Sequence, residues 1–199
     1  MQTRQLAAQI QQTLLKKYGE VAADAAGHFP YPVGRASAQQ LGYDAAWLDA
    51  IPPTVVSHFV GVGNPFHVHV VQPGQRVLDA GCGCGMDSFI ASLLVGTTGH
   101  VTGLDLCAEM LAVPRAELPR WRPQNLEFVQ GELENLPFAD ESFDVVISNG
   151  VLNLAVDKDC AFREIYRVLK PGGVLATADL LVIDSVPDAV LCSLDAWST

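Results

Sequence analysis

Residues 77–85 of this 199-residue chain read VLDAGCGCG, and this stretch decides the fold. A short β-prone run ends in a loop with glycine at every second position, and an apolar helical stretch begins at Met86. Glycine allows the backbone to turn with positive φ and to approach a ligand closely. A strand that passes through such a loop into a helix is typical of the ligand-binding edge of a parallel α/β sheet.

Beyond this loop, β-prone runs alternate with helical stretches. We expect strands at 101–106, 126–130, 143–148 and from 174 onward, and helices at 108–118 and 157–169. The run Val145-Val146-Ile147 is continuously apolar, as expected of a strand that is covered on both faces. Strands joined by helices imply right-handed crossovers. The predicted fold class is therefore α/β, a Rossmann-like doubly wound parallel sheet.

The last predicted helix has an apolar stripe on which we expect Phe162, Ile165, Tyr166 and Leu169 to share one face. A helix of this kind would cover one face of the sheet.

The N-terminal part has a different pattern. Leu6, Ile10 and Leu14 recur every four residues and predict a helix that ends at Gly19. Residues 20–35 show no period and contain several glycines and prolines, so we expect a loop there.

A second short helix is predicted after Asp44, which is a suitable N-cap, and its end is predicted at Pro52-Pro53. Pro73-Gly74 marks a change of character. The predicted organisation is an N-terminal helical extension or lid at 1–73 and a ligand-binding domain at 74–199.

The overall charge excludes several classes of partner. Lys and Arg number 12 against 22 Asp and Glu, a net charge of −10, so a phosphate track for nucleic acid or an anionic membrane surface is not expected. Hydrophobic residues make up 49%, yet no apolar run approaches the ~20 residues of a membrane span. The N-terminal sequence does not resemble a signal peptide, and the five cysteines form no disulfide framework. These features favour a cytoplasmic protein.

Two acids beside the loop indicate the kind of ligand. A dinucleotide fingerprint would need glycine where Met86 stands, so that motif fails. Asp79 lies two residues before the first glycine and would repel a pyrophosphate, whereas it suits an ammonium or sulfonium group. Asp105 ends the next strand, where a carboxylate can accept hydrogen bonds from two ribose hydroxyls. A ligand with cationic and ribose groups but no phosphate fits both acids.

Five motifs then carry a family resemblance. In chain order they are VLDAGCGCG, GLDL, QGELENLPF, FDVVISNGVLNL and RVLKPGG. Together they resemble the class I S-adenosylmethionine-dependent methyltransferases. The segments GNP at 63–65, SNGVLNLAVDK at 148–158 and FREIYRVLKPGG at 162–173 are similar, within that class, to the arsenite methyltransferase family. The resemblance covers Tyr18-Gly19 and about residues 51–182.

The resemblance implies S-adenosylmethionine as cofactor and a set of residues that would bind it. Asp79 and Gly81 would hold the methionine end, Gly83 would allow close approach, and Asp105 would bind the ribose. Ten residues are assigned to the cofactor in this way: Tyr18, Asp79, Gly81, Gly83, Asp105, Leu106, Met110, Glu132, Leu133 and Asn149. Of the packing residues, Met110 and Leu133 fit a plain hydrophobic core equally well.

The cysteines depart from the arsenite methyltransferase pattern. That family carries cysteines ahead of the glycine loop, after the Ser-Asn of the fourth motif and near the C-terminus. Here the first cysteine is Cys82, Val62 and Gly150 occupy two of those positions, and Cys192 is the C-terminal thiol. As(III) prefers sulfur ligands, as soft metals do, so the sequence favours a different acceptor.

The other cysteines and the histidines yield no catalytic or metal site. Cys107 and Cys160 stand at or near helix starts, where a thiol pKa can fall, although helix packing is the simpler explanation. His67 and His69 lie where the family has a helix, so no metal pair is expected. His58 is expected to be packed or at the surface.

The unpatterned loop at 20–35 carries two further polar candidates. His28 and Tyr31 would reach the active site only if this loop folds over it, and a solvated loop is the simpler expectation. The catalytic residue stays unassigned, and no metal is predicted.

Three functions remain open. The first is S-adenosylmethionine-dependent methyl transfer to an unidentified small molecule, the second is arsenite methylation, and the third is a non-catalytic cofactor- or partner-binding protein. The third is suggested by the 16 residues that follow Ile183, fewer than the ~30 of a further helix and hairpin. A C-terminal end shortened in this way would expose a sheet edge, through which a second copy could form a homo-oligomer.

Overall fold

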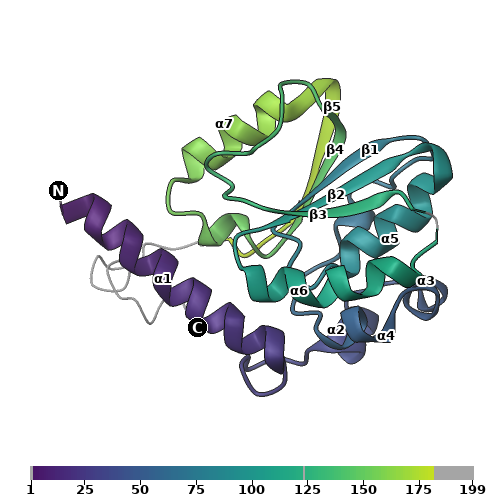
Figure 1. Ribbon diagram of the computed structural model, residues 1–199, viewed down its shortest axis with the longest axis horizontal. Helices are drawn as coiled ribbons and strands as arrows, with labels where there is room; N and C mark the ends of the chain where they lie inside the picture. Colours follow the sequence, from purple (N-terminus) through teal and green to yellow (C-terminus); the bar gives the residue numbers. More distant parts are fainter. Residues whose placement is uncertain (1, 123, 182–199) are drawn as a thin grey trace.

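The computed structural model describes residues 2–122 and 124–181. Within them lies a five-stranded sheet with the strand order β3-β2-β1-β4-β5 (Figure 1). The strands are β1 (Arg76–Ala80), β2 (His100–Asp105), β3 (Leu126–Gln130), β4 (Phe143–Asn149) and β5 (Leu169–Ala178). All neighbouring strands are parallel. The chain moves outward from β1 to β3 and then returns to the other side of β1, which confirms the predicted doubly wound sheet.

Helices cover both faces of this sheet. The helices α5 (Met86–Val95) and α6 (Ala108–Glu117) lie on one face, and α7 (Lys158–Val168) lies on the other (Figure 1). Side chains of β4 alternate between the two layers: Val145 and Ile147 belong to the hydrophobic cluster with α5, whereas Val146 belongs to the cluster with α7. This burial on both faces explains the continuous apolar run in the sequence.

Residues ahead of β1 form helices on the α5 side of the sheet. They are α1 (Gln2–Ala23), α2 (Gly34–Gln40), α3 (Ala45–Ala50) and α4 (Pro53–Ser57). Short 3-10 turns occur at η1 (Pro65–His67), η2 (Gly96–Thr98), η3 (Leu118–Arg120) and η4 (Leu152–Leu154). Leu48, Val55 and Phe66 pack in the same cluster as Phe89 of α5, so the N-terminal segment shares a core with the sheet. The boundary between 73 and 74 stays a prediction.

The predicted end of the first helix at Gly19 is wrong. The helix continues to Ala23, because a glycine inside a helix costs only about 1 kcal/mol. Val21 is completely buried and continues the apolar stripe that packs α1 on α6. A Cβ at Gly19 would lie 4.0 Å from the Glu109 side chain, an ordinary contact, so the helix does not require glycine at this position. The predicted loop is correspondingly shorter, since α2 already begins at Gly34.

Asp44 caps α3 as predicted, its side chain accepting a hydrogen bond from the Ala46 amide at 2.8 Å. The Pro52-Pro53 pair ends this helix and also begins the next one, which the sequence analysis missed. Proline suits the first position of a helix because the amide hydrogen it lacks has no partner there.

The predicted face of the last helix is right for Ile165 and wrong for Phe162 and Tyr166. Ala161, Ile165 and Val168 are buried, whereas Phe162 and Tyr166 are 46% and 82% exposed. The buried stripe includes Ala161, which lies about 100° from Phe162 around the helix. The helix ends at Val168 and Leu169 already begins β5, pairing with Phe143 ahead of an irregularity in the ladder.

Strand β5 stands at one end of the strand order, as the prediction of a sheet edge requires. The predicted C-terminal shortening concerns residues 182–199, which lie outside the described residues. Homo-oligomer formation stays a prediction. In the described part of the chain, no helix combines the length and apolarity needed to cross a membrane.

Candidate functional site

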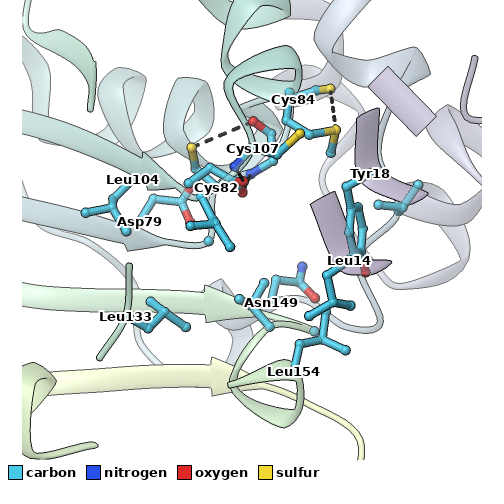
Figure 2. A pocket seen from close by; sticks show the side chains of 18 of the residues that line it. Leu14, Tyr18, Asp79, Cys82, Cys84, Leu104, Cys107, Leu133, Asn149 and Leu154 are labelled. Carbon is cyan, nitrogen blue, oxygen red and sulfur yellow. Dashed lines mark hydrogen bonds between the residues drawn. The ribbon is translucent and has the colours of Figure 1, made fainter. Parts of the chain in front are cut away.

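A cavity opens at the carboxyl ends of β1 to β4, where parallel α/β sheets bind ligands. Asp79 of β1, Asn149 of β4 and Tyr18 of α1 surround it, although they are far apart in the sequence (Figure 2). All ten residues assigned to the cofactor from the sequence line this one cavity: Tyr18, Asp79, Gly81, Gly83, Asp105, Leu106, Met110, Glu132, Leu133 and Asn149. The fold thus brings the complete predicted set together.

The glycine loop has a conformation that explains its glycines. Gly81, Gly83 and Gly85 have φ values of 77°, 52° and 85°, in the left-handed region that favours glycine. A Cβ on Gly81 would lie 2.3 Å from Val151 Cγ1, so a side chain is also excluded by the loop after β4.

Four of the five amides of the loop at 81–85 have acceptors within the protein. The Gly81 and Cys82 amides donate to the Leu104 carbonyl at 2.8 and 2.9 Å, and the Gly85 amide donates to the Cys82 carbonyl at 2.8 Å. The Gly83 amide donates to Asp105 Oδ2 at 2.8 Å. These four N–H groups are satisfied within the protein, which explains in structural terms why the loop does not suit a phosphate.

Asp79 is 2% exposed and accepts a hydrogen bond from the Ser88 hydroxyl. Burial raises its pKa well above the ordinary value, and the negative charge of Asp87 raises it further. None of the described residues that line the cavity is a lysine or an arginine. The carboxyl therefore lacks a cationic partner within the described lining, and an ammonium group of a ligand would supply one.

Asp105 fastens the glycine loop to the end of β2. Besides the Gly83 amide, it accepts the Cys107 amide through Oδ1 at 2.9 Å. Burial raises its pKa, and the backbone amides partly offset that effect. A carboxylate has about four lone-pair positions, so both oxygens retain capacity for the hydroxyls of a ligand.

The cavity wall beyond Asp105 is apolar. Met110 and Leu133 are 2% and 8% exposed and pack in hydrophobic clusters while also lining the cavity, so a place in the core does not exclude contact with a ligand. Leu106 is half-buried beside them. Glu132 is exposed, and its Oε1 accepts a hydrogen bond from Gln11 Nε2 of α1 at 3.1 Å.

Asn149 lies in the cavity wall, but its side chain is occupied by the protein. Its Oδ1 accepts the Val62 and Gly63 amides at 2.9 and 3.1 Å. Its Nδ2 donates to Asp87 Oδ2 at 3.0 Å and to the Gly63 carbonyl at 2.9 Å. Both hydrogens and both lone pairs of the carboxamide thus have partners, which the sequence did not indicate.

Tyr18 reaches the cavity from α1, and Leu14, one helical turn earlier, lies on the same side (Figure 2). Burial raises the pKa of the Tyr18 phenol, and Tyr31, Asp105 and Asp179 raise it further. The phenol is therefore neutral at physiological pH and can donate a hydrogen bond.

Several cavity residues were missed from the sequence. Asp87 stands two residues after the glycine loop, and Gln11 and Leu14 lie on the predicted helix, so their positions were readable although their role was not. His58 was expected to be packed or at the surface, yet it is one of the lining residues. His58 directly follows α4, and its Nδ1 lies 2.8 Å from the Thr54 carbonyl in the first turn of that helix.

No metal site appears in the described part of the chain, where no group of three or more His, Cys, Asp and Glu residues could hold an ion. His67 lies in η1 and is exposed, and His69 Nε2 is buried without a hydrogen-bond partner. His28 and Tyr31 do not line the cavity, although Tyr31 packs against Phe29 at 5.1 Å.

The described cysteines are free thiols. Burial raises the pKa of Cys82 and Cys107, and it raises that of Cys84 to about 12. Cys107 is 2% exposed and belongs to a hydrophobic cluster, which confirms that packing is the better explanation for it, and desolvation is the largest effect on its pKa. Cys192 lies outside the described residues.

Residues 72–196 match the protein family described as a methyltransferase domain. This chain belongs to the methyltransferase domain family. The match includes every strand and the whole glycine loop, so the resemblance seen in the five motifs is confirmed. The fold and the family agree on an α/β methyltransferase architecture.

Relatives of this methyltransferase domain include proteins with two different named activities. The arsenite methyltransferase of Halobacterium salinarum is 41% identical over 158 residues, which cover 79% of this chain and 40% of that protein. The demethylmenaquinone methyltransferase of Listeria welshimeri is 43% identical over 109 residues, covering 55% of this chain and 46% of that protein. The methyltransferase domain therefore spans less than half the length of these curated relatives.

A solved structure agrees with this assignment. An arsenic(III) S-adenosylmethionine methyltransferase from Chlamydomonas reinhardtii superposes with a TM-score of 0.68 at 38% identity, covering 76% of this chain and 56% of that one. The match shows that the methyltransferase domain keeps its fold in a protein described as acting on arsenic(III).

Proposed function

We propose that this methyltransferase domain binds S-adenosylmethionine and transfers its methyl group to a small molecule. The observation that carries the proposal is Asp79, a buried carboxyl with no described cationic partner, at the centre of a cavity without lysine or arginine in its described lining. Cofactor and protein charges are complementary there, since the cofactor is a cation without phosphate. The satisfied amides of the glycine loop support the same ligand.

The cofactor roles follow from the positions of the ten residues. Asp79 would accept the ammonium group, and Asp105 would accept the ribose hydroxyls with the lone pairs that the Gly83 and Cys107 amides leave free. Leu106, Met110 and Leu133 would pack on the adenine, and Glu132 would face its edge. Asn149 would line the methionine portion, and Tyr18 would close the cavity from α1.

The reactive methyl group belongs to the cofactor, whose sulfonium makes it susceptible to in-line attack. The chain positions the reactants and excludes water. Residues 2–73 would serve as a lid, since α1 contributes Leu14 and Tyr18 to the cavity wall and is tied to Glu132 through Gln11. No catalytic residue is assigned.

The acceptor we favour is not an arsenical. Val62 and Gly150 stand where the arsenite methyltransferase pattern has cysteine, and the Val62 methyl carbons lie 3.3 Å from where a Cβ on Gly150 would be. The two positions therefore lie next to each other, and Gly150 lines the cavity. The raised pKa values of Cys82, Cys84 and Cys107 keep those thiols protonated, which disfavours metalloid binding.

Arsenite methylation is the second candidate, and the names of the relatives favour it. Incubation with arsenite, glutathione and methyl-labelled S-adenosylmethionine would yield labelled methylarsenicals if it were correct. We expect no labelled arsenical and, in metabolite extracts, a labelled organic product. Failure to label any acceptor would favour the third candidate, a non-catalytic binding protein.

The first test is calorimetric titration with S-adenosylhomocysteine, with NADH as a control ligand. We expect micromolar or tighter binding of the first and none of the second. Asp79→Asn should weaken binding at least 30-fold, because it removes the carboxylate that accepts the ammonium group.

Asp144→Asn is the matched control for this titration. It changes a strand aspartate at the opposite end of the sheet, where Asp144 accepts the Arg76 amide at 2.8 Å, and should leave the affinity unchanged. Absence of binding to the unmodified protein would contradict the proposal, as would equal losses in the two variants.

A further inference from the structure

A buried polar junction, consisting of Tyr43, Asp87 and Asn149, lies beside the glycine loop. The Tyr43 hydroxyl donates to Asp87 Oδ1 at 2.7 Å, and Asn149 Nδ2 donates to Asp87 Oδ2 at 3.0 Å. Tyr43 and Asp87 are 4% and 6% exposed, so these bonds are shielded from water. The three residues come from the turn before α3, the first turn of α5 and the end of β4.

Asp87 on one side and the Val62 and Gly63 amides on the other fix the orientation of the Asn149 carboxamide. An ionised carboxylate only accepts hydrogen bonds, so the NH2 group of Asn149 must face it. The Asn149 oxygen then points the other way, where it accepts the Val62 and Gly63 amides at 2.9 and 3.1 Å. With the carboxamide reversed, its NH2 group would face those two N–H donors and both bonds would be lost.

The segment at 61–63 is built to receive this group closely. A Cβ on Gly61 would lie 2.5 Å from Asn149 Nδ2, and a Cβ on Gly63 would lie 2.6 Å from Ala178 Cβ of β5. Neither position has room for a side chain. The segment is therefore seated between the ends of β4 and β5, and Gly61 lines the cavity.

We infer that Asp87 is a positioning residue: by orienting the Asn149 carboxamide, it holds residues 61–63 in place as a wall of the cavity. The wall carries Val62, which faces Gly150, so the junction determines the shape of the cavity next to that pair. The inference rests on the proposed function in one respect: it takes the methyl acceptor to bind next to this wall of the cavity.

Asp87 is buried in surroundings that are unfavourable for an acid, which suggests that it has a role other than stabilising the fold. The ionisable groups that act on one another here are Tyr43, Asp79 and Asp87 itself, and none of them is a cation. Burial raises the pKa of Asp87 to about 6. A buried carboxylate without a cation lowers the stability of the fold, so stability alone would favour a neutral residue.

Site-resolved amide hydrogen exchange tests the inference without cofactor or acceptor. In Asp87→Ala at pH 6, the Val62 and Gly63 amides should exchange at least tenfold faster, while the amides of β1 keep their protection. Tyr43→Phe, which removes one partner of Asp87, should give a smaller increase at the same two amides. Asp49→Ala, which removes an exposed ion pair with Arg35, is the control and should change neither.

A pH series separates positioning from simple packing. In the unmodified protein, the protection of Val62 and Gly63 should fall as the pH rises from 5 to 7, because opening of the segment lets water reach the ionised carboxylate. In Asp87→Asn, which keeps the size of the side chain and cannot ionise, the protection should not vary with pH. Asp79→Asn should retain the pH dependence, since Asp87 is still present.

Three results would overturn the inference. They are unchanged exchange at Val62 and Gly63 in Asp87→Ala, an equal increase throughout the sheet, and the same pH dependence in Asp87→Asn as in the unmodified protein. S-adenosylhomocysteine titration of the same variants distinguishes this failure from failure of the proposed function. If the unmodified protein does not bind S-adenosylhomocysteine, the proposed function fails. The exchange experiment still tests whether Asp87 positions residues 61–63, because it uses neither cofactor nor acceptor.

Discussion

The two sides of the cavity are constructed differently. Most residues assigned to the cofactor lie at strand ends and in the loops that directly follow them, so Asp79, Gly81 and Gly83 lie within five residues. The other side is the junction that joins Asn149 to Tyr43, residues 61–63 and Asp87, where hydrogen bonds connect positions up to 106 residues apart. The first side resembles a recurrent motif, whereas the second belongs to this chain's own tertiary packing. The comparison indicates that the cofactor is readable from sequence and that the acceptor is not.

The comparison is sharpened most by a change at the junction. Asp87→Asn should raise the free energy of unfolding by up to about 3 kcal/mol at pH 8, since the pKa is raised from 3.8 to about 6 and one pKa unit corresponds to about 1.4 kcal/mol. Between about pH 4 and 6, Asp87 is protonated in the folded protein and ionised in the unfolded chain. The free energy of unfolding of the unmodified protein therefore falls as the pH rises through this range.

Urea unfolding at pH 8 and pH 4 measures this effect. At pH 4 the difference between the variant and the unmodified protein should be small, because the carboxyl is then mostly neutral in the folded state. The free energy of unfolding of Asp87→Asn minus that of the unmodified protein should be larger at pH 8 than at pH 4. A smaller difference at pH 8 would contradict the destabilisation that we assign to the buried charge.

A pair of glycine substitutions compares the two sides directly. Gly81→Ala should cost about 2–3 kcal/mol of stability, since positive φ costs about 1 kcal/mol and the new Cβ would be 2.3 Å from Val151. Gly150→Ala also has a positive φ, of 71°, but its Cβ would meet Val62 at 3.3 Å, so about 1 kcal/mol is expected. Chemical denaturation would reveal the order. Equal losses would mean that the loop after β4 adapts to Gly81→Ala.

The smallest effect we expect concerns the pH dependence of ligand affinity. Because burial raises the pKa of Asp79, binding of an ammonium group must release a proton from it below that pKa. Below the pKa of Asp79 in the free protein, the affinity for S-adenosylhomocysteine should therefore increase about tenfold for each unit by which the pH rises. Above that pKa the affinity should stay constant. Titrations in buffers of different ionisation enthalpy would detect the released proton. A pH-independent affinity would show that Asp79 is already ionised in the free protein.

The sequence was sufficient for the sheet and for the cofactor side. The strands were recognisable because burial on both faces makes them continuously apolar, and Asp79 and Asp105 could be placed because parallel strands end at the same edge. The errors arose where tertiary contacts override local signals. Gly19 does not end α1 because Val21 packs against α6, and Phe162 and Tyr166 are exposed because the sheet contacts the neighbouring stripe of α7.

By itself, therefore, the sequence determined the α/β fold, the methyltransferase family and the placement of Asp79 and Asp105 at one edge of the sheet. The tertiary structure alone decided that Asn149 binds residues 61–63, that Asp87 lies buried between Tyr43 and Asn149, and that Val62 faces Gly150. The physical reason is the separation in sequence between the residues that make contact. A motif fixes geometry over a few residues of backbone, whereas these contacts depend on how segments 44 to 106 residues apart are positioned when their apolar faces are buried together.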